Sequence, residues 1–183
     1  FSAGDSLLGG LVSPRPAGAP ARWLHYVTVP DAEAAAADAG RLGGKVLAPP
    51  RDIPAIGRFA VVADPAGAVI LPFQPRQPAS LDPEAPAPGH FCWHELLTTD
   101  LAACRAFYAG VFGWTVHDDA LPDGAAHVVF RCGEHAAGGM LALPAEGPPA
   151  HWLPYVAAAD LDAVVGAIAP AGGRVLRAAT ALP

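Results

Sequence analysis

Apolar residues recur at helical spacing on one face of the segment that follows Asp100. These residues are Leu101, Cys104, Tyr108 and Val111. Aspartate is a favoured N-cap because its carboxylate accepts backbone N–H groups of the first turn, and Gly113 supplies a residue that ends helices readily. The pattern predicts a helix of about three turns between Asp100 and Gly113.

Short β-prone runs accompany this helix and recur earlier in the chain. Residues 126–130 and 139–143 are predicted as strands after the helix, and Trp93 opens a strand before it. Residues 58–63 and 68–73 flank the sequence DPAG at 64–67, whose proline and glycine suit a type I turn, so a hairpin is expected there. The predicted module is strand, helix, strand, strand, strand.

The chain repeats itself at an offset of 129 residues. Residues 1–54 align without a gap on residues 130–183, and 18 of the 54 positions are identical. The match includes ARWLHYV at 21–27 beside AHWLPYV at 150–156, and Asp31 beside Asp160. A period this long indicates duplicated domains, since solenoid repeats run roughly 20–50 residues.

Composition and charge argue against nucleic-acid binding and against a membrane span. The chain has 183 residues, a net charge of −6 and a single lysine, so it lacks the basic surface that binds a nucleic-acid backbone. No apolar run is long enough for a membrane span. Three scattered cysteines without a CxxC spacing favour a reducing compartment, and the cytoplasm is the expected location.

Three runs carry a resemblance to a known family. They are WHELLTTD at 93–100, AFYAGVFGW at 106–114 and RFAVVADPAG at 58–67. Together they are similar to the vicinal oxygen chelate superfamily, which holds glyoxalase I, bleomycin resistance proteins and extradiol dioxygenases. The resemblance implies an α+β fold in which paired βαβββ modules form curled mixed sheets around a small-molecule site.

The resemblance also implies how the chain divides. Residues 1–76 are expected to be the C-terminal part of a first glyoxalase-like domain, 77–89 a proline-rich linker, and 90–183 a second domain that lacks its C-terminal hairpin. We therefore expect the natural protein to be about two full periods long, or each cup to be completed by another subunit. The expected assembly is a monomer with pseudo-twofold domains or a homodimer.

Family enzymes hold a divalent metal through His, Gln or Glu on the first and last strands of each module. The matching first-strand positions, seven residues before the capping aspartates, are Trp93, Leu153 and Leu24, and one last-strand position is Leu71. None of these side chains binds a metal, so no metal and no cofactor are expected. The seven histidines form no HxH or HExxH pair, and His94 and Glu95 point to opposite faces of a strand.

Glu95 is the candidate catalytic residue because it shares a strand face with Trp93 and Leu97. A carboxylate among such neighbours has a raised pKa, which suits a general acid or base or a hydrogen bond to a ligand. The alternative is a structural glutamate bonded to backbone. The candidate ligand-binding residues are Trp93, Trp152, Tyr155, Trp23 and Tyr26. Aromatic side chains at equivalent repeat positions suit either a stacked ligand or core packing.

These observations favour a protein that binds a small organic molecule without the usual metal triad. The alternatives are a lyase or dioxygenase, with a metal at an off-pattern site or with Glu95 as acid or base, and a protein whose cups are only structural.

Overall fold

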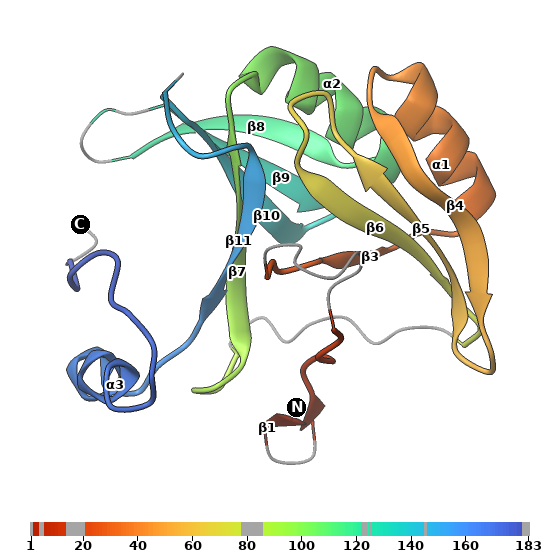
Figure 1. Cartoon of the computed structure of the whole chain (residues 1–183). Helices are drawn as coiled ribbons and strands as arrows, with labels where there is room; N and C mark the ends of the chain where they lie inside the picture. The colour runs from red at the N-terminus through yellow and green to blue at the C-terminus, as the bar shows by residue number, and fades with distance from the viewer. Residues whose placement is uncertain are drawn as a thin grey trace.

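The computed structural model describes residues 2–3, 6–13, 21–77, 86–121, 124, 126–144 and 146–180. Two complete βαβββ modules follow one another along the chain (Figure 1). The first comprises β3 (Tyr26–Thr28), α1 (Ala32–Arg41), β4 (Lys45–Ile53), β5 (Gly57–Ala63) and β6 (Val69–Pro75). The second comprises β7 (Phe91–Thr98), α2 (Leu101–Phe112), β8 (Thr115–Ala120), β9 (Ala126–Cys132) and β10 (His135–Ala142). A third strand–helix pair follows as β11 (His151–Val156) and α3 (Leu161–Ile168), and a short β1–β2 hairpin (Ser2–Ala3, Ser6–Leu7) precedes the first module.

Both modules form mixed sheets with the same strand order. The first sheet runs β3-β6-β5-β4, and the second runs β11-β7-β10-β9-β8. In each, the first strand of the module lies parallel to the last, and the other pairs are antiparallel. β11 adds to the second sheet by pairing antiparallel with β7. The predicted α+β class and module order are therefore confirmed.

Each helix begins at the aspartate that the sequence suggested. Asp31, Asp100 and Asp160 each accept at least one backbone N–H of the first turn through a side-chain oxygen. α2 ends at Gly113, whose φ of 68° lies in the left-handed region that favours glycine. These contacts satisfy donors and acceptors that a helix end otherwise leaves open.

The two modules share one core. α1 buries Ala32, Ala35, Ala36 and Ala39 on its sheet, and α2 buries Cys104, Phe107, Tyr108 and Val111. The helices lie side by side (Figure 1). Their buried residues form one cluster with those of both sheets. The small alanines of α1 allow close approach, whereas α2 contributes large aromatic side chains. α3 buries none of its residues and lies apart from both helices.

A buried polar chain crosses the boundary between the modules. Asp64 begins the predicted turn between β5 and β6, and its Oδ1 accepts the backbone N–H groups of Ala66 and Ala68. Its Oδ2 accepts the Tyr108 hydroxyl of α2 at 3.0 Å, and the Trp152 indole on β11 donates to that hydroxyl at 2.9 Å. Asp64 is 3% exposed, and burial raises its pKa. The DPAG sequence therefore stabilises both the hairpin and the module contact.

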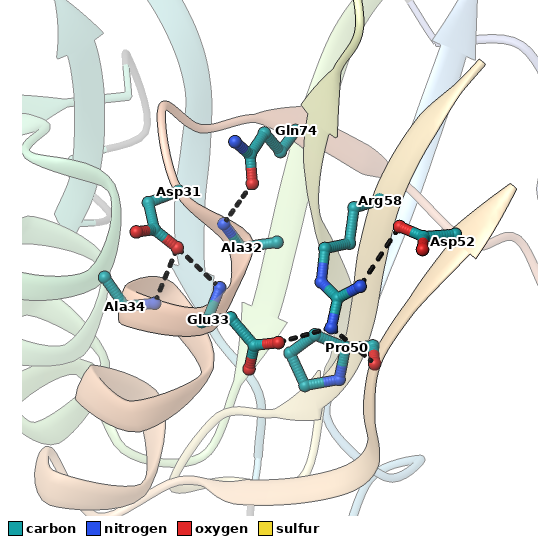
Figure 2. Close-up of polar contacts among 8 residues, drawn as sticks. All are labelled: Asp31, Ala32, Glu33, Ala34, Pro50, Asp52, Arg58 and Gln74. Carbon is teal, nitrogen blue, oxygen red and sulfur yellow. Dashed lines mark hydrogen bonds and ion pairs between the residues drawn. The ribbon is translucent and has the colours of Figure 1, made fainter. Parts of the chain in front are cut away.

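An arginine cluster ties the start of α1 to its sheet (Figure 2). Arg58 on β5 pairs with Glu33 of α1 and donates to Asp52 on β4 at 3.0 Å. Gln74 on β6 accepts the backbone N–H of Ala32 at 3.2 Å. A surface hollow of about 330 Å³ adjoins this cluster, lined by Asp52, Gly57, Arg58, Gln74, Pro75 and Arg76. Because carboxylates already engage Arg58, we assign the cluster a structural role.

The two copies of the repeat agree in part. In the β1–β2 hairpin Ser2 pairs with Leu7, and 129 residues later Arg131 pairs with Ala136 at the tip of the β9–β10 hairpin. β3 and α1 likewise correspond to β11 and α3. The copies differ after the helix, because residues 45–53 form β4 whereas residues 174–180 form no strand.

The expected domain boundaries depend on the proline-rich linker at 77–89. Most of the expected linker, residues 78–85, lies outside the described residues. The domain boundaries therefore stay a prediction.

Cys92, Cys104 and Cys132 are all free thiols. In the part of the chain that the structure describes, no helix has the length and apolar character needed to cross a bilayer.

Candidate functional site

Glu95 lies on β7, on the sheet face opposite α2. Its neighbour Leu96 points the other way, into the core beneath α2, because side chains alternate along a strand. Glu95 is nonetheless only 4% exposed, so its carboxylate is buried on a face that carries no helix of its own module. A buried carboxylate costs free energy unless polar partners stabilise it.

Two side chains supply those partners. The Trp93 indole Nε1 donates to Glu95 Oε2 at 2.7 Å, from two residues earlier on the same strand. The His127 Nε2, on β9, lies 3.2 Å from Oε1 and 3.4 Å from Oε2. Burial raises the pKa of Glu95, and the Trp93 hydrogen bond and the nearby His127 oppose that rise. Both contacts of Glu95 are with side chains. The alternative interpretation, a structural glutamate, expected bonds to backbone groups instead.

Gly139 makes the contact between Glu95 and His127 geometrically possible. The two residues lie on strands that flank β10, and Gly139 of β10 sits directly beside Glu95 in the register. A Cβ at Gly139 would lie 2.5 Å from Glu95 Oε1 and 2.5 Å from His127 Nε2. The missing side chain therefore opens the gap across which the carboxylate and the imidazole meet. A β-bulge precedes it on β10, between Ala136 and Gly138.

Apolar side chains surround the carboxylate on the β11 side. In the pairing of β11 with β7, Leu153 lies beside Glu95 and Tyr155 lies beside Trp93. Leu153 is 38% exposed and Tyr155 43% exposed. Burial raises the pKa of the Tyr155 hydroxyl, the charge of Glu95 raises it further, and Arg177 opposes the rise. The buried polar group thus adjoins an open apolar surface.

The structure separates the five aromatic candidates into three groups. Trp93 and Tyr155 lie beside Glu95 on its face of the second sheet. Trp152 is 5% exposed and packs edge-on against Tyr108 on the α2 side, which corresponds to the core-packing interpretation. Trp23 and Tyr26 belong to the first module, where Trp23 contacts Phe91 edge-on and Tyr26 contacts Phe59 and Phe73.

The metal that the family pattern implies does not fit these residues. Trp93, Leu153, Leu24 and Leu71 occupy the expected ligand positions and carry no ligating oxygen, sulfur or imidazole nitrogen. Within the described residues, no group of three or more His, Cys, Asp or Glu side chains is arranged to hold an ion. Glu95 and His127 are two donors of suitable chemistry, but they lie off the family positions.

A histidine pair marks the junction between the modules. His25 precedes β3 and His94 lies on β7, with their rings edge-on at 4.7 Å between centroids. His25 also contacts the Trp152 ring at 5.9 Å. Burial and the proximity of His94 lower the pKa of His25 from 6.5 to about 4. His25 is therefore neutral near pH 7 in this contact.

The sequence did not identify His127 as the partner of Glu95. The two residues are 32 positions apart and lie on strands that do not pair directly. Their approach depends on the parallel crossover that places β10 between β7 and β9. The available signal was the glycine pair at 138–139, which marked an unusual point of the strand but not what faces it.

Comparison with known proteins gives a family match. Residues 88–181 match the model of the Glyoxalase/Bleomycin resistance protein/Dioxygenase superfamily. A putative glyoxylase, CFP32, from Mycobacterium bovis is 33% identical over 178 residues, covering 94% of this chain and 67% of that protein. The anthracycline biosynthesis protein DnrV from Streptomyces peucetius is 33% identical over 159 residues, covering 86% of this chain and 57% of the relative.

A solved structure shares the fold. The 2,2',3-trihydroxybiphenyl 1,2-dioxygenase from Sphingomonas wittichii strain RW1 superposes with a TM-score of 0.52 at 17% sequence identity. The match covers 84% of this chain and 60% of the dioxygenase chain. At this identity the likeness bears on fold alone. The chain thus spans about two thirds or less of the length of these proteins.

Proposed function

Because this chain belongs to the glyoxalase/bleomycin resistance protein/dioxygenase superfamily, we propose that its second module binds a small organic molecule on the sheet face that carries Glu95. The observation that carries the proposal is the buried carboxylate of Glu95 beside exposed apolar side chains. Charged groups are rarely buried on a sheet face unless they are paired or functional. The proposed site consists of Glu95, Trp93, Tyr155 and the neighbouring Leu153.

The aromatic character of the face supports a flat ligand. Tyr155 and Trp93 are adjacent across β11 and β7, and rings of this kind stack on planar molecules. The relative from Streptomyces peucetius is named as an anthracycline biosynthesis protein. We therefore expect the ligand of this protein to be aromatic or extensively conjugated.

Thermal-shift and calorimetric titration with 2-naphthol test this proposal. We expect 2-naphthol to raise the melting temperature of the protein, and Tyr155→Ala to abolish that increase. Tyr26→Ala is the matched control, because Tyr26 occupies the equivalent repeat position and is similarly exposed, at 53% against 43%. Absence of binding to the wild-type protein, or equal loss in both variants, would contradict the assignment of the ligand to the second module.

A second function is favoured by the electrostatics of Glu95. Burial raises the pKa of its carboxyl group, and a carboxyl group so placed suits proton transfer to or from a bound substrate. Lyase or dioxygenase activity therefore remains the alternative function for this face. Turnover that Glu95→Gln removes, with binding of the same substrate retained, would favour the enzyme over the binding protein.

We also propose that the chain carries parts of two tandem domains. Support comes from the β1–β2 hairpin, whose register repeats at the tip of β9–β10, and from β11 and α3, which repeat β3 and α1. On this proposal further strands, from the same polypeptide or another subunit, complete each cup. Light scattering and intact mass measured on the natural full-length protein test it, and a stable monomer of 18.6 kDa would overturn it.

A further inference from the structure

The Glu95–His127 pair lies across an intervening strand, which is an unusual way to place two polar side chains. Glu95 is on β7 and His127 on β9, and both are nearly buried, with side-chain exposures of 6% and 11%. They meet above Gly139 of β10, where any side chain would overlap both. The contact therefore depends on residues of three strands. A purely structural carboxylate could be satisfied by neighbouring residues of its own strand.

The pair has hydrogen-bonding capacity that none of the described residues uses. A carboxylate accepts about four hydrogen bonds. The described contacts of Glu95 are the Trp93 indole at Oε2 and the His127 imidazole shared between both oxygens. Each carboxylate oxygen can therefore accept another donor. The exposed Leu153 and Tyr155 adjoin this group, so a donor reaching it would be attached to an apolar molecule.

The burial of the pair indicates which donor fits. Glu95 and His127 are nearly buried beside apolar side chains, where a charged ligand group would lose its hydration. A neutral hydroxyl group is the donor that pairs with a carboxylate at small desolvation cost, and the bond to a charged acceptor is stronger than one between neutral groups. A phenolic or enolic hydroxyl on a flat apolar molecule satisfies these conditions.

We propose that Glu95 and His127 form a single binding unit for the hydroxyl group of a neutral phenol or enol. The ligand hydroxyl donates to the Glu95 carboxylate, His127 positions that carboxylate, and Gly139 provides the space for both. The inference rests on the proposed function, because it names the class of ligand that the same face would take.

The test compares 2-naphthol with its methyl ether, 2-methoxynaphthalene, which has the same ring system without the donor. We expect the wild-type protein to bind 2-naphthol about tenfold more tightly than the ether, as the net value of a hydrogen bond to a charged group implies. Glu95→Gln, His127→Gln and Gly139→Ala should each remove most of this preference while retaining binding of the ether. The double variant Glu95→Gln/His127→Gln should lose no more than either single variant if the residues act as one unit.

A pH profile separates the positioning role of His127 from a structural one. 2-Naphthol remains neutral through the mildly acidic range, so a change in its affinity there reports the protein. We expect the wild-type affinity to fall as pH falls through the pKa of Glu95, because a protonated carboxyl is a weaker acceptor. The midpoint should shift to higher pH in His127→Gln, since His127 lowers the Glu95 pKa, and the profile of Glu95→Gln should be flat.

The outcomes distinguish this inference from the proposed function. If neither naphthalene compound binds, the proposed function fails and the inference fails with it. If both compounds bind equally to the wild-type protein, the proposed ligand-binding face is supported, but the proposal of a hydroxyl-binding unit is wrong. Stoichiometric Zn²⁺ binding by calorimetry, lost in Glu95→Gln and in competition with 2-naphthol, would instead make the pair a metal site and overturn the inference.

Discussion

The first and second modules place different chemistry on the same scaffold. Tyr26 beside Leu71 in the first sheet corresponds to Glu95 beside Gly139 in the second, each at the same point of the parallel strand pair. Around them, the first module gathers an aromatic cluster of Tyr26, Phe59 and Phe73, and the second joins Glu95 to His127.

The registers extend this correspondence to the neighbouring strands. Phe59 pairs with Phe73 in the first sheet, as His127 pairs with Leu141 in the second. The aromatic cluster shows that apolar side chains at these positions are compatible with the fold. The carboxylate and imidazole of the second module are therefore not required by the scaffold. This contrast supports a functional interpretation of Glu95 and His127.

The largest expected effect concerns the contact that the modules share. Asp64→Ala removes the acceptor of two turn N–H groups and leaves the buried Tyr108 hydroxyl without its acceptor. We expect the free energy of unfolding to fall by about 3 kcal/mol in urea denaturation. Asp100→Ala is the control, because it removes an exposed N-cap and should cost about 1 kcal/mol. Equal losses would contradict a special role for the module contact.

Acid should weaken the junction through His25. Its folded pKa is lowered from 6.5 to about 4, so the stability linked to its neutral form is fully present above pH 6.5 and is lost as pH falls toward 4. As pH falls over this range, we expect the free energy of unfolding of His25→Gln to fall by about 2 kcal/mol less than that of the wild-type protein. This value allows for the partial exposure of the ring. Urea unfolding at several pH values measures the difference. Parallel curves for the two proteins would refute the assignment.

The tryptophans of the repeat should respond unequally to one substitution. Trp152→Phe removes a buried ring edge and its hydrogen bond to Tyr108, so we expect about 1.5 kcal/mol of destabilisation. Trp23→Phe, at the equivalent position but 52% exposed, should change stability by less than about 0.5 kcal/mol. Thermal unfolding of both variants provides the comparison. A larger loss at Trp23 would show that the first-module position is buried in solution.

A small effect on stability is expected of Glu95→Gln. Because the folded pKa of Glu95 is raised, its contribution is fully present below its ordinary value of 4.5 and is lost as pH rises through the folded pKa. The variant should differ from the wild-type protein by less than about 1 kcal/mol and gain relative stability as pH rises. Tyr26→Phe should show no such trend. A uniform loss of about 1–3 kcal/mol at all pH values would favour a structural Glu95.

Local signals in the sequence determined most of the module. Asp31, Asp100 and Asp160 capped their helices as predicted, since a cap needs only the residues of the first turn. The DPAG turn formed for the same reason, with contacts inside four or five consecutive residues. Alternation along β7 also placed Glu95 and Leu96 on opposite faces, as the sequence implied.

Contacts between distant segments decided the site. Glu95 could be selected from its strand neighbours, but His127 could not, because its approach depends on β10 lying between β7 and β9. Tertiary packing also separated Trp152 from Trp23, which the repeat treats as equivalent. Trp152 lies beneath α2, whereas the Trp23 ring remains half exposed beside Phe91.

The two copies of the repeat show that similar local sequences do not always form the same secondary structure. GGKVL at 43–47 leads into β4, whereas GGRVL at 172–176 forms no strand. β4 exists because β5 accepts its hydrogen bonds, and residues 174–180 have no paired strand among the described residues. α3 nevertheless forms just before them without burying a side chain. A helix closes its hydrogen bonds within its own segment, so sequence alone determined it, whereas a strand takes its hydrogen bonds from a partner that only the tertiary structure supplies.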